Sequence, residues 1–272
     1  MYKRVAILGV DGMGRFNSKA DTPCMDELFA NGAVTYGALT SIPTISGQCW
    51  GSMLLGVGPK THGLTNAIAS TQPYDIASPC PSIFRVTREA MPDARLAAFS
   101  NWNPINTGII EENLGVHKET GGSDAEVCEK ILAYLDSNDP ALLFVQFDEV
   151  DGAGHKFGYG AKLFLEKITW NDALIGRIVA KYREKGWAED TLFIVSADHG
   201  GNRFHGHGGR SRNEKMIFIG CAGKTVKAGS TGKMNVKDIA AVAAHALGLE
   251  APAVWTAKVP EGIFSFDIRS QL

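Results

Sequence analysis

Residues 5–12 read VAILGVDG, and this stretch sets the expectation for the whole fold. The run Val5–Val10 is short and apolar throughout, which is typical of a strand buried on both faces, and Asp11-Gly12 ends it with a turn. Strands of that kind occur in parallel sheets that helices cover on both sides. The stretch therefore predicts an α/β protein whose first strand is buried within the sheet.

The rest of the chain alternates between extended and helical patterns, which indicates a mostly parallel sheet with helices on both faces. We expect further strands at Ala33–Leu39, Arg95–Phe99, Ala141–Phe147, Thr191–Ser196 and Met216–Ile219, and helices at Thr22–Ala30, up to Gly56, and at Ile83–Ala90, Asp124–Leu135, Ala161–Lys185 and Val236–Leu247. Gly58–Pro81 and Asn101–Gly122 are predicted to be long loops. No repeat, low-complexity tract or linker interrupts the pattern, so residues 1–272 are predicted to form one domain.

The composition is that of an ordinary globular protein, with 44% hydrophobic and 21% charged residues among 272. The formal net charge is −2 and the pI about 6.4. Such a chain has no overall basic field to attract nucleic acid or an anionic membrane as its main partner. Affinity for a phosphate-bearing ligand would have to come from a local site, such as bound cations.

The cysteines and the apolar runs indicate a soluble cytoplasmic protein. The five cysteines are scattered and contain no C-x-x-C pair, which argues against a disulfide framework and a cysteine zinc site. Asp11-Gly12 interrupts the N-terminal apolar run too early for a signal peptide. No apolar run approaches the roughly 20 residues that span a bilayer. The oligomeric state is left open.

Acidic and histidine side chains follow three of the predicted strands. Val10 is followed by Asp11, Phe147 by the segment 148–155 (DEVDGAGH), and Ser196 by the segment 197–209 (ADHGGNRFHGHGG). The carboxyl ends of parallel strands meet at one edge of a sheet, so we expect these loops to lie together. Carboxylate oxygen and imidazole nitrogen are good ligands for zinc, manganese or iron. Taken singly, such a loop is more often a turn or a helix cap than a metal site, but the joint occurrence of the three favours a metal site.

A hydroxyl group near these loops could serve as a nucleophile. The segment 40–56 (TSIPTISGQCWGSMLLG) places Thr44 and Ser46 just before a predicted helix. The N-terminus of a helix suits an anionic phosphoryl group. Ser46 alone reads as a helix cap; beside two metal ions, a bound hydroxyl would lose its proton easily and attack. Ser46 is the preferred candidate, and Thr44 is the alternative.

Together these features resemble the alkaline phosphatase superfamily, and most of all its nucleotide pyrophosphatase/phosphodiesterase branch, over nearly the whole chain. Asp11-Gly12 resembles the metal-binding pair after the first strand. Residues 151–155 match the D-x-x-G-H pair of one metal, residues 198–200 match the D-H-G pair of the other, and His207-Gly208 matches the late histidine. The spacing from Ser46 to Gly56 matches that from the family's nucleophile to the end of the next helix.

The resemblance implies an alkaline phosphatase-like three-layer sandwich without a large cap insertion. It implies a type I phosphodiesterase-like hydrolase that forms a phosphoseryl intermediate on Ser46 and acts on a small phosphate ester, with nucleotides among the candidates. Two divalent metal ions are implied, with zinc preferred over manganese. One ion would be held by Asp151, His155 and His207, and the other by Asp11, Asp198, His199 and Ser46.

The sequence departs from the branch after the nucleophile, where Gly47 and Gln48 replace a common Pro and Asn, so Gln48 is a candidate for the missing phosphate contact. His205 is the alternative to His207 as the late ligand. A phosphomonoesterase remains open if an arginine binds the terminal phosphate, and so does a binding module without catalysis. Trp50 stands where a sulfatase has arginine. Trp50 and Trp102 could line a substrate pocket, or Trp102 could lie in a rigid turn.

Overall fold

The computed structural model describes residues 1–265 of the chain. Eight strands in this part form one sheet in the order β4-β3-β5-β1-β6-β7-β2-β8. Their bounds are β1 (Arg4–Val10), β2 (Ala33–Leu39), β3 (Leu96–Ser100), β4 (His117–Thr120), β5 (Leu142–Phe147), β6 (Thr191–Ser196), β7 (Met216–Ala222) and β8 (Gly229–Ser230).

Strand β1 lies in the middle of the sheet, parallel to β5 on one side and to β6 on the other. Ile7 is paired with Phe144 and with Ile194, and every residue of β1 is buried. Among the eight strands of residues 1–265, only β7 runs antiparallel to its neighbours, β6 and β2. The prediction of a mostly parallel sheet with β1 buried inside it is confirmed.

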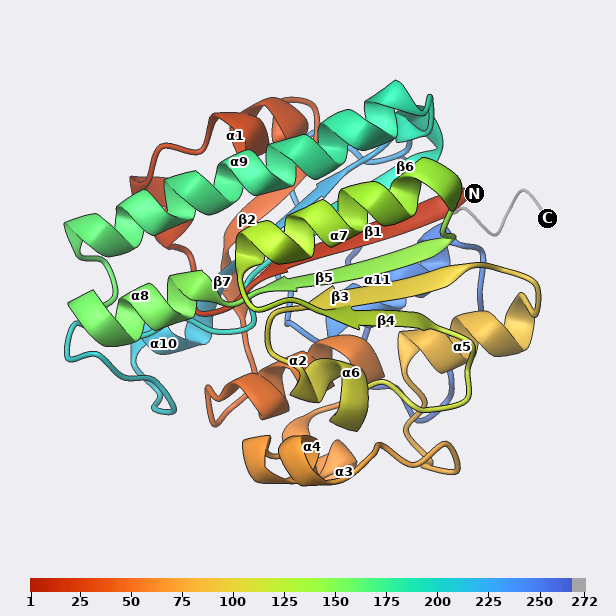
Figure 1. Cartoon of the computed structure of the whole chain (residues 1–272), viewed down its shortest axis with the longest axis horizontal. Helices are drawn as coiled ribbons and strands as arrows, with labels where there is room; N and C mark the ends of the chain where they lie inside the picture. Colours follow the sequence, from red (N-terminus) through yellow and green to blue (C-terminus); the bar gives the residue numbers. More distant parts are fainter. Residues whose placement is uncertain (266–272) are drawn as a thin grey trace.

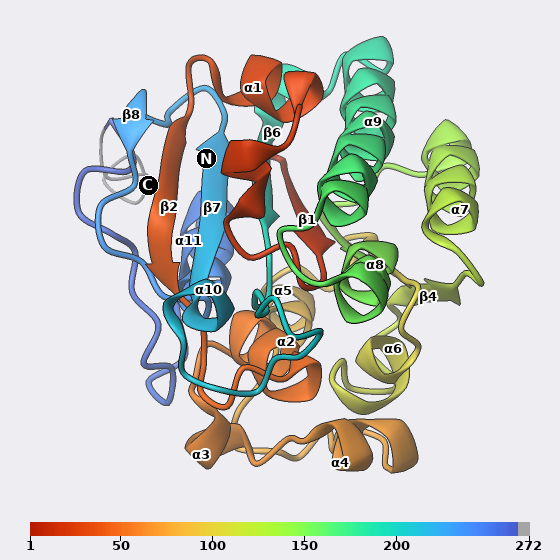
Figure 2. The same cartoon turned by 90° about the vertical axis from the view of Figure 1, so that its left-hand side faces the viewer.

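Helices cover both faces of the sheet (Figure 1 and Figure 2). Helices α1, α7, α8 and α9 lie on one face, and α2, α5 and α11 on the other. Their bounds are α1 (Pro23–Phe29), α2 (Ser46–Leu55), α3 (Pro59–His62), α4 (Asn66–Thr71), α5 (Ile83–Ala90), α6 (Pro104–Gly108), α7 (Asp124–Ser137), α8 (Glu149–Phe157), α9 (Lys162–Glu184), α10 (Arg212–Lys215) and α11 (Asp238–Ala246). The architecture is the predicted three-layer sandwich.

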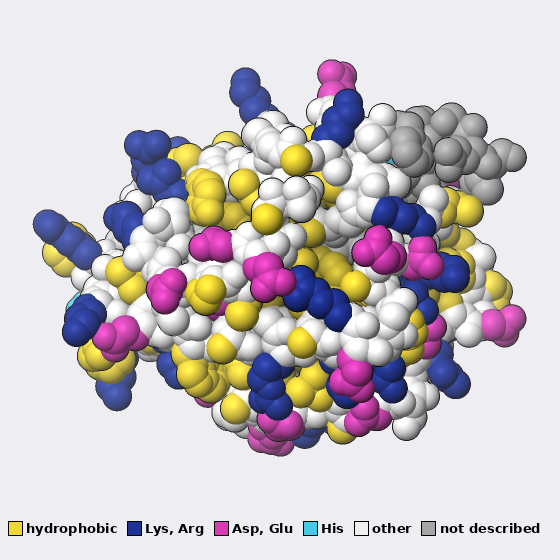
Figure 3. Space-filling view, turned by 90° about the horizontal axis from the view of Figure 1, so that it is seen from above, with side chains coloured by type: hydrophobic (Ala, Val, Ile, Leu, Met, Phe, Trp, Pro, Cys, Tyr) yellow, Lys and Arg dark blue, Asp and Glu magenta, His cyan; other side chains and the backbone are white. Residues whose placement is uncertain are grey.

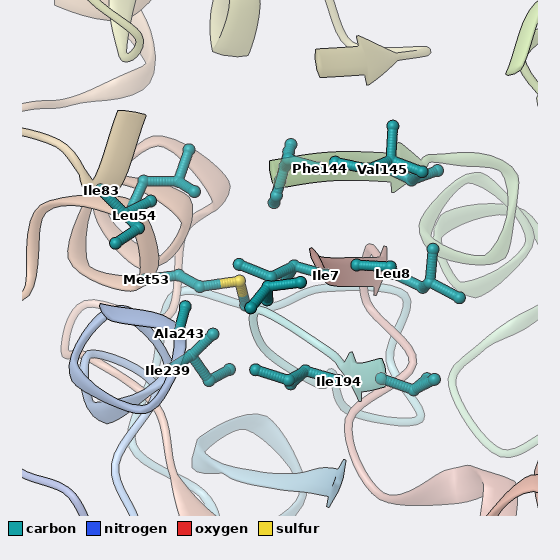
Figure 4. Close-up of a cluster of buried hydrophobic side chains, with 14 of the residues drawn as sticks. Ile7, Leu8, Met53, Leu54, Ile83, Phe144, Val145, Ile194, Ile239 and Ala243 are labelled. Carbon is teal, nitrogen blue, oxygen red and sulfur yellow. The ribbon is translucent and has the colours of Figure 1, made fainter. Parts of the chain in front are cut away.

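Side chains of the central strands pack alternately on the two helical layers. Figure 4 shows Ile7 and Ile194 facing Met53 of α2 and Ile239 of α11, while Leu8 points to the opposite side. This alternation is that of a pleated strand buried on both faces. The same alternation determines the direction in which the side chain of the residue after each strand points.

Both stretches that were predicted to be loops contain regular structure. The first holds α3 and α4, and the second holds α6 and β4. Helix α3 has only four residues, with Pro59 in its first turn and Gly63 in a left-handed conformation at its end. Such short elements show no hydrophobic period, although their proline and glycine signals are present in the sequence.

The outer surface carries charges of both signs. On the face seen from above in Figure 3, basic and acidic side chains are interspersed, in keeping with the net charge of −2. No helix within residues 1–265 has both the length and the apolar character needed to cross a membrane.

Candidate active site

Asp11, Asp198 and His199 form a buried cluster at the carboxyl ends of β1 and β6, called here the inner group. Each offers one ligand atom, and these atoms lie within 4.8 Å of one another. His199 Nε2 is 3.3 Å from Asp198 Oδ2 and 3.5 Å from Asp11 Oδ1. The exposed fraction of all three residues is 1% or less. The neighbouring parallel strands β1 and β6 bring them together, as the strand-end pattern predicts.

One oxygen of each carboxylate in the inner group is held by protein donors and the other is not. Asp11 Oδ2 accepts hydrogen bonds from Trp50 Nε1 at 2.9 Å and Gln146 Nε2 at 3.1 Å. Asp198 Oδ1 accepts from the backbone N–H groups of Gly12 at 3.1 Å and His199 at 2.7 Å. Asp11 Oδ1 and Asp198 Oδ2 have no hydrogen-bond donor among the described residues. Two buried acceptors without donors are costly unless a cation lies between them.

The His199 ring directs its Nε2 at the two carboxylates. Its Nδ1 lies 3.1 Å from the carbonyl of Gly200. Because a carbonyl only accepts, Nδ1 carries the proton and Nε2 presents its lone pair to the carboxylates. Burial, with the nearby ring of His207, lowers the pKa of His199 to about 3, so the ring is neutral. Burial and the repulsion of neighbouring carboxylates raise the pKa values of Asp11 and Asp198.

Asp151, His155 and His207 form a second cluster, called here the outer group. His155 Nε2 lies 3.1 Å from both Asp151 Oδ2 and His207 Nε2. The Nδ1 atoms of His155 and His207 bond to the carbonyls of His205 at 2.8 Å and Thr44 at 2.7 Å, so both rings direct Nε2 at the site. The His155 side chain is 48% exposed, whereas those of Asp151 and His207 are 13% and 12% exposed, so the outer group reaches solvent mainly at His155.

Asp151 and His155 lie on helix α8, whereas the sequence predicted that the segment after β5 is a loop. They are four residues apart and therefore share one face of the helix. The hydrogen bond with Asp151 raises the pKa of His155 to about 9, against the opposing effect of partial burial. Without a metal ion, a proton on His155 therefore occupies the outer group, and an ion would displace it.

The structure separates the two candidate nucleophiles. Ser46 is the first residue of α2, with Oγ 3.3 Å from His199 Nε2. It is not the cap of that helix, because the cap position is Ile45. Thr44 is fully buried, and its hydroxyl accepts from Gly208 N at 2.8 Å and bonds to the Gly209 carbonyl at 3.1 Å.

His205 does not point its ring at the outer group. Its Nδ1 lies 3.0 Å from the backbone carbonyl of His155, while its own carbonyl accepts from His155 Nδ1. This reciprocal pair ties the loop after β6 to the end of α8. His207, rather than His205, therefore belongs to the outer group.

A family model described as type I phosphodiesterase / nucleotide pyrophosphatase matches residues 87–246, more than half of the chain. The chain belongs to this family. The match includes all three residues of the outer group as well as Asp198 and His199, while Asp11 and Ser46 precede it. The family takes its name from enzymes that cleave phosphodiesters and nucleotide pyrophosphates.

Solved structures with the same fold include phosphodiesterases and sulfatases. Murine ectonucleotide pyrophosphatase/phosphodiesterase 5 is 14% identical, with a TM-score of 0.76 over 91% of this chain and 96% of that one. An inactive form of the same murine protein in complex with AMP gives 0.78 at 13% identity, over 99% of both chains. A 2-O GAG sulfatase gives 0.79 at 12% identity, over 97% of this chain and 74% of that one. These likenesses establish the alkaline phosphatase-like fold.

A curated relative matches only in part. GPI ethanolamine phosphate transferase 2 of Aspergillus fumigatus is 30% identical over 99 residues, which are 35% of this chain. The chain spans 13% of the length of that relative.

Three residues of this phosphodiesterase family member have positions that sequence reasoning missed. Trp50 lines no substrate pocket: it is fully buried and donates to Asp11. Gln146 is also fully buried and donates to the same oxygen. Asn66 Oδ1 accepts the Gly47 N–H at 2.6 Å, which leaves the amide NH₂ of Asn66 beside the start of α2. No local pattern in the sequence marks Asn66, because its contact with Gly47 joins residues 19 positions apart.

Proposed function

We propose that the protein hydrolyses phosphodiesters with two divalent metal ions and Ser46 as the nucleophile. The observation that carries this proposal is the pair of unpartnered buried oxygens, Asp11 Oδ1 and Asp198 Oδ2, beside the lone pair of His199 and the hydroxyl of Ser46. The donor set fits divalent ions that take nitrogen and oxygen ligands. Zinc is the preferred ion on resemblance, and manganese suits the same ligands.

The roles of the residues follow from this arrangement. The inner group with Ser46 would hold one ion and the outer group the other. Bound ions would lower the pKa of the Ser46 hydroxyl and neutralise charge on the phosphoryl oxygens. Ser46 Oγ would form a bond to phosphorus as the bond to the leaving ester oxygen breaks. Water would then cleave the phosphoseryl ester and restore the hydroxyl.

The start of α2 would contribute to phosphate binding. Free N–H groups at a helix N-terminus suit an anionic group. The Asn66 amide, whose oxygen is already bonded to Gly47, has its NH₂ group left to donate to a phosphate oxygen. This contact would replace the one that the residues after Ser46 lack, so Asn66 is a better candidate for it than Gln48.

We propose a small phosphate ester, such as a nucleotide, as the substrate. The complex of the murine relative with AMP supports this class of ligand. We further propose that residues 1–272 form a single catalytic domain without a large cap, so that the exposed outer group would receive substrate directly from solvent.

The proposal is tested by hydrolysis of bis(p-nitrophenyl) phosphate and p-nitrophenyl phosphate with added zinc or manganese. Ser46→Ala should abolish turnover and leave most of the metal binding intact, whereas Thr44→Val should retain measurable turnover. A preference for the monoester would make the protein a phosphomonoesterase. An active Ser46→Ala protein beside an inactive Thr44→Val protein would overturn the assignment of the nucleophile. Metal-loaded wild type without turnover of either compound would favour a binding module.

A further inference from the structure

The side-chain amide of Gln146, near the end of β5, makes four hydrogen bonds in the interior. Its Nε2 donates to Asp11 Oδ2 at 3.1 Å and to Asp148 Oδ1 at 2.8 Å. Its Oε1 accepts from the backbone N–H groups of Asn101 at 3.0 Å and Trp102 at 2.8 Å. Both hydrogens and both lone pairs of the amide are therefore in use.

These contacts fix the orientation of the amide. Two backbone N–H groups can only be met by the oxygen of Gln146, so its NH₂ group must face the two carboxylates. The loop that begins at Asn101 thus determines which donors Asp11 receives. A rotated amide would lose all four hydrogen bonds.

Asp11 Oδ2 has a second donor, Trp50 Nε1 at 2.9 Å. With both donors on Oδ2, the other oxygen, Oδ1, is directed at the inner group, 3.5 Å from His199 Nε2. We propose that Gln146 and Trp50 are positioning residues that hold Asp11 so that Oδ1 is presented to an ion in the inner group. This inference rests on the proposed binding of metal ions there.

Gln146 also contacts Asp148, the residue that precedes α8. Helix α8 carries Asp151 and His155 of the outer group. Asp124 accepts the backbone N–H of Asp148 at 2.8 Å and so holds the start of α8 independently of Gln146. Loss of the Gln146 amide should therefore weaken the inner group more than the outer group.

The test is calorimetric titration of the metal-free protein with Zn²⁺. His155→Ala removes one member of the outer group, so the Zn²⁺-binding step that remains in this variant is assigned to the inner group. Gln146→Met and Trp50→Phe each remove one donor to Asp11 and introduce an apolar side chain of similar shape; Gln146→Met also removes the hydrogen bonds to Asp148, Asn101 and Trp102. Each should lower the Zn²⁺ affinity of the inner group by about 10- to 100-fold, the usual effect of losing a hydrogen bond to a metal ligand, with a smaller change at the outer group.

Asn106→Leu is the matched control. Asn106 is buried, and its amide donates to the Glu119 carbonyl at 2.9 Å and to Thr120 Oγ1 at 3.2 Å, away from both groups. It should lower stability without changing Zn²⁺ affinity. Unchanged inner-group affinity in the folded Gln146 and Trp50 variants would overturn the inference, whereas a wild type that binds no Zn²⁺ would overturn the proposed function as well.

Discussion

Replacing Asp198 by asparagine should stabilise the metal-free protein while reducing its response to metal ions. In the Asp198→Asn variant, the two backbone N–H groups that bond to Oδ1 require an oxygen at that position. The new NH₂ group would take the place of the unpartnered Oδ2, which lies 3.3 Å from His199 Nε2. The substitution would therefore replace a buried acceptor that has no donor with an NH₂ group that can donate to the lone pair of His199 Nε2.

The size of the effect follows from the cost of that unpartnered atom. A buried polar atom without a hydrogen bond costs about 1–3 kcal/mol, and the variant would recover an amount of this order. For a chain of this size each kcal/mol shifts Tm by about 2–4 °C. A metal ion at 100 times its Kd should in turn stabilise the wild type by about 2.7 kcal/mol. The variant, lacking one charged ligand, should gain much less.

Asp172→Asn is the matched control for this substitution. Asp172 is as buried as Asp198, but its oxygens accept the N–H groups of Cys24 and Met25, each at 2.8 Å. An NH₂ group there would face an N–H group, so the same substitution should destabilise the protein by about 1–3 kcal/mol. Opposite signs at two equally buried aspartates would trace the effect to the missing partner rather than to burial.

The assay is thermal unfolding of the three proteins in a mildly alkaline buffer, after chelation and again with zinc. The order of Tm values without metal should be Asp198→Asn, wild type, Asp172→Asn. Zinc should raise the Tm of the wild type above that of Asp198→Asn. If Asp198→Asn melts below the wild type without metal, or gains as much from zinc, the reasoning is refuted.

Two further predictions concern pH and a glycine. Burial lowers the pKa of His62, whose Nε2 is bonded to Ser52, to about 4. Between pH 6.5 and pH 4, the His62 side chain therefore takes up a proton only in the unfolded chain. The free energy of unfolding should accordingly fall by about 3 kcal/mol as the pH is lowered through this range. Urea unfolding should show that the stability of the wild type falls relative to that of His62→Gln as the pH is lowered over this range. If the two stabilities change in parallel with pH, His62 is not the group responsible. Gly12→Ala should weaken outer-group zinc binding, since φ is 66° and a Cβ would overlap Asp151. Gly63→Ala is the control: a Cβ there meets open space, so this variant should lose only about 1 kcal/mol of stability through backbone strain. Equal zinc affinities of the two variants in calorimetry would contradict the prediction for Gly12.

The strands and the residues that follow them could be predicted because the signal is local. An apolar run such as Val5–Val10 indicates a buried strand, and the carboxyl ends of parallel strands lie at one edge of the sheet. Helix α8 could not be predicted in this way. Its segment contains Gly152 and Gly154, which are poor helix formers, and its start is held by Asp124, far away in the sequence.

The role of Trp50 depended on a contact between distant segments. As an aromatic residue near the nucleophile it suggested a substrate pocket. In the structure its ring packs against Gly9 of β1, where a Cβ would overlap the indole, and this allows Nε1 to reach Asp11. A glycine inside a strand signals a close approach, but not which residue approaches.

The two groups differ in their access to solvent, and this has a consequence for exchange kinetics. The His207 ring stacks on the His199 ring, with centroids 4.0 Å apart, and so covers part of the buried inner group. An ion there would leave only after the outer histidines had moved, whereas an outer ion would exchange through an open face. Brief dialysis of zinc-loaded protein against an enriched zinc isotope should therefore yield a mixed protein, with the original zinc retained inside and the new isotope outside.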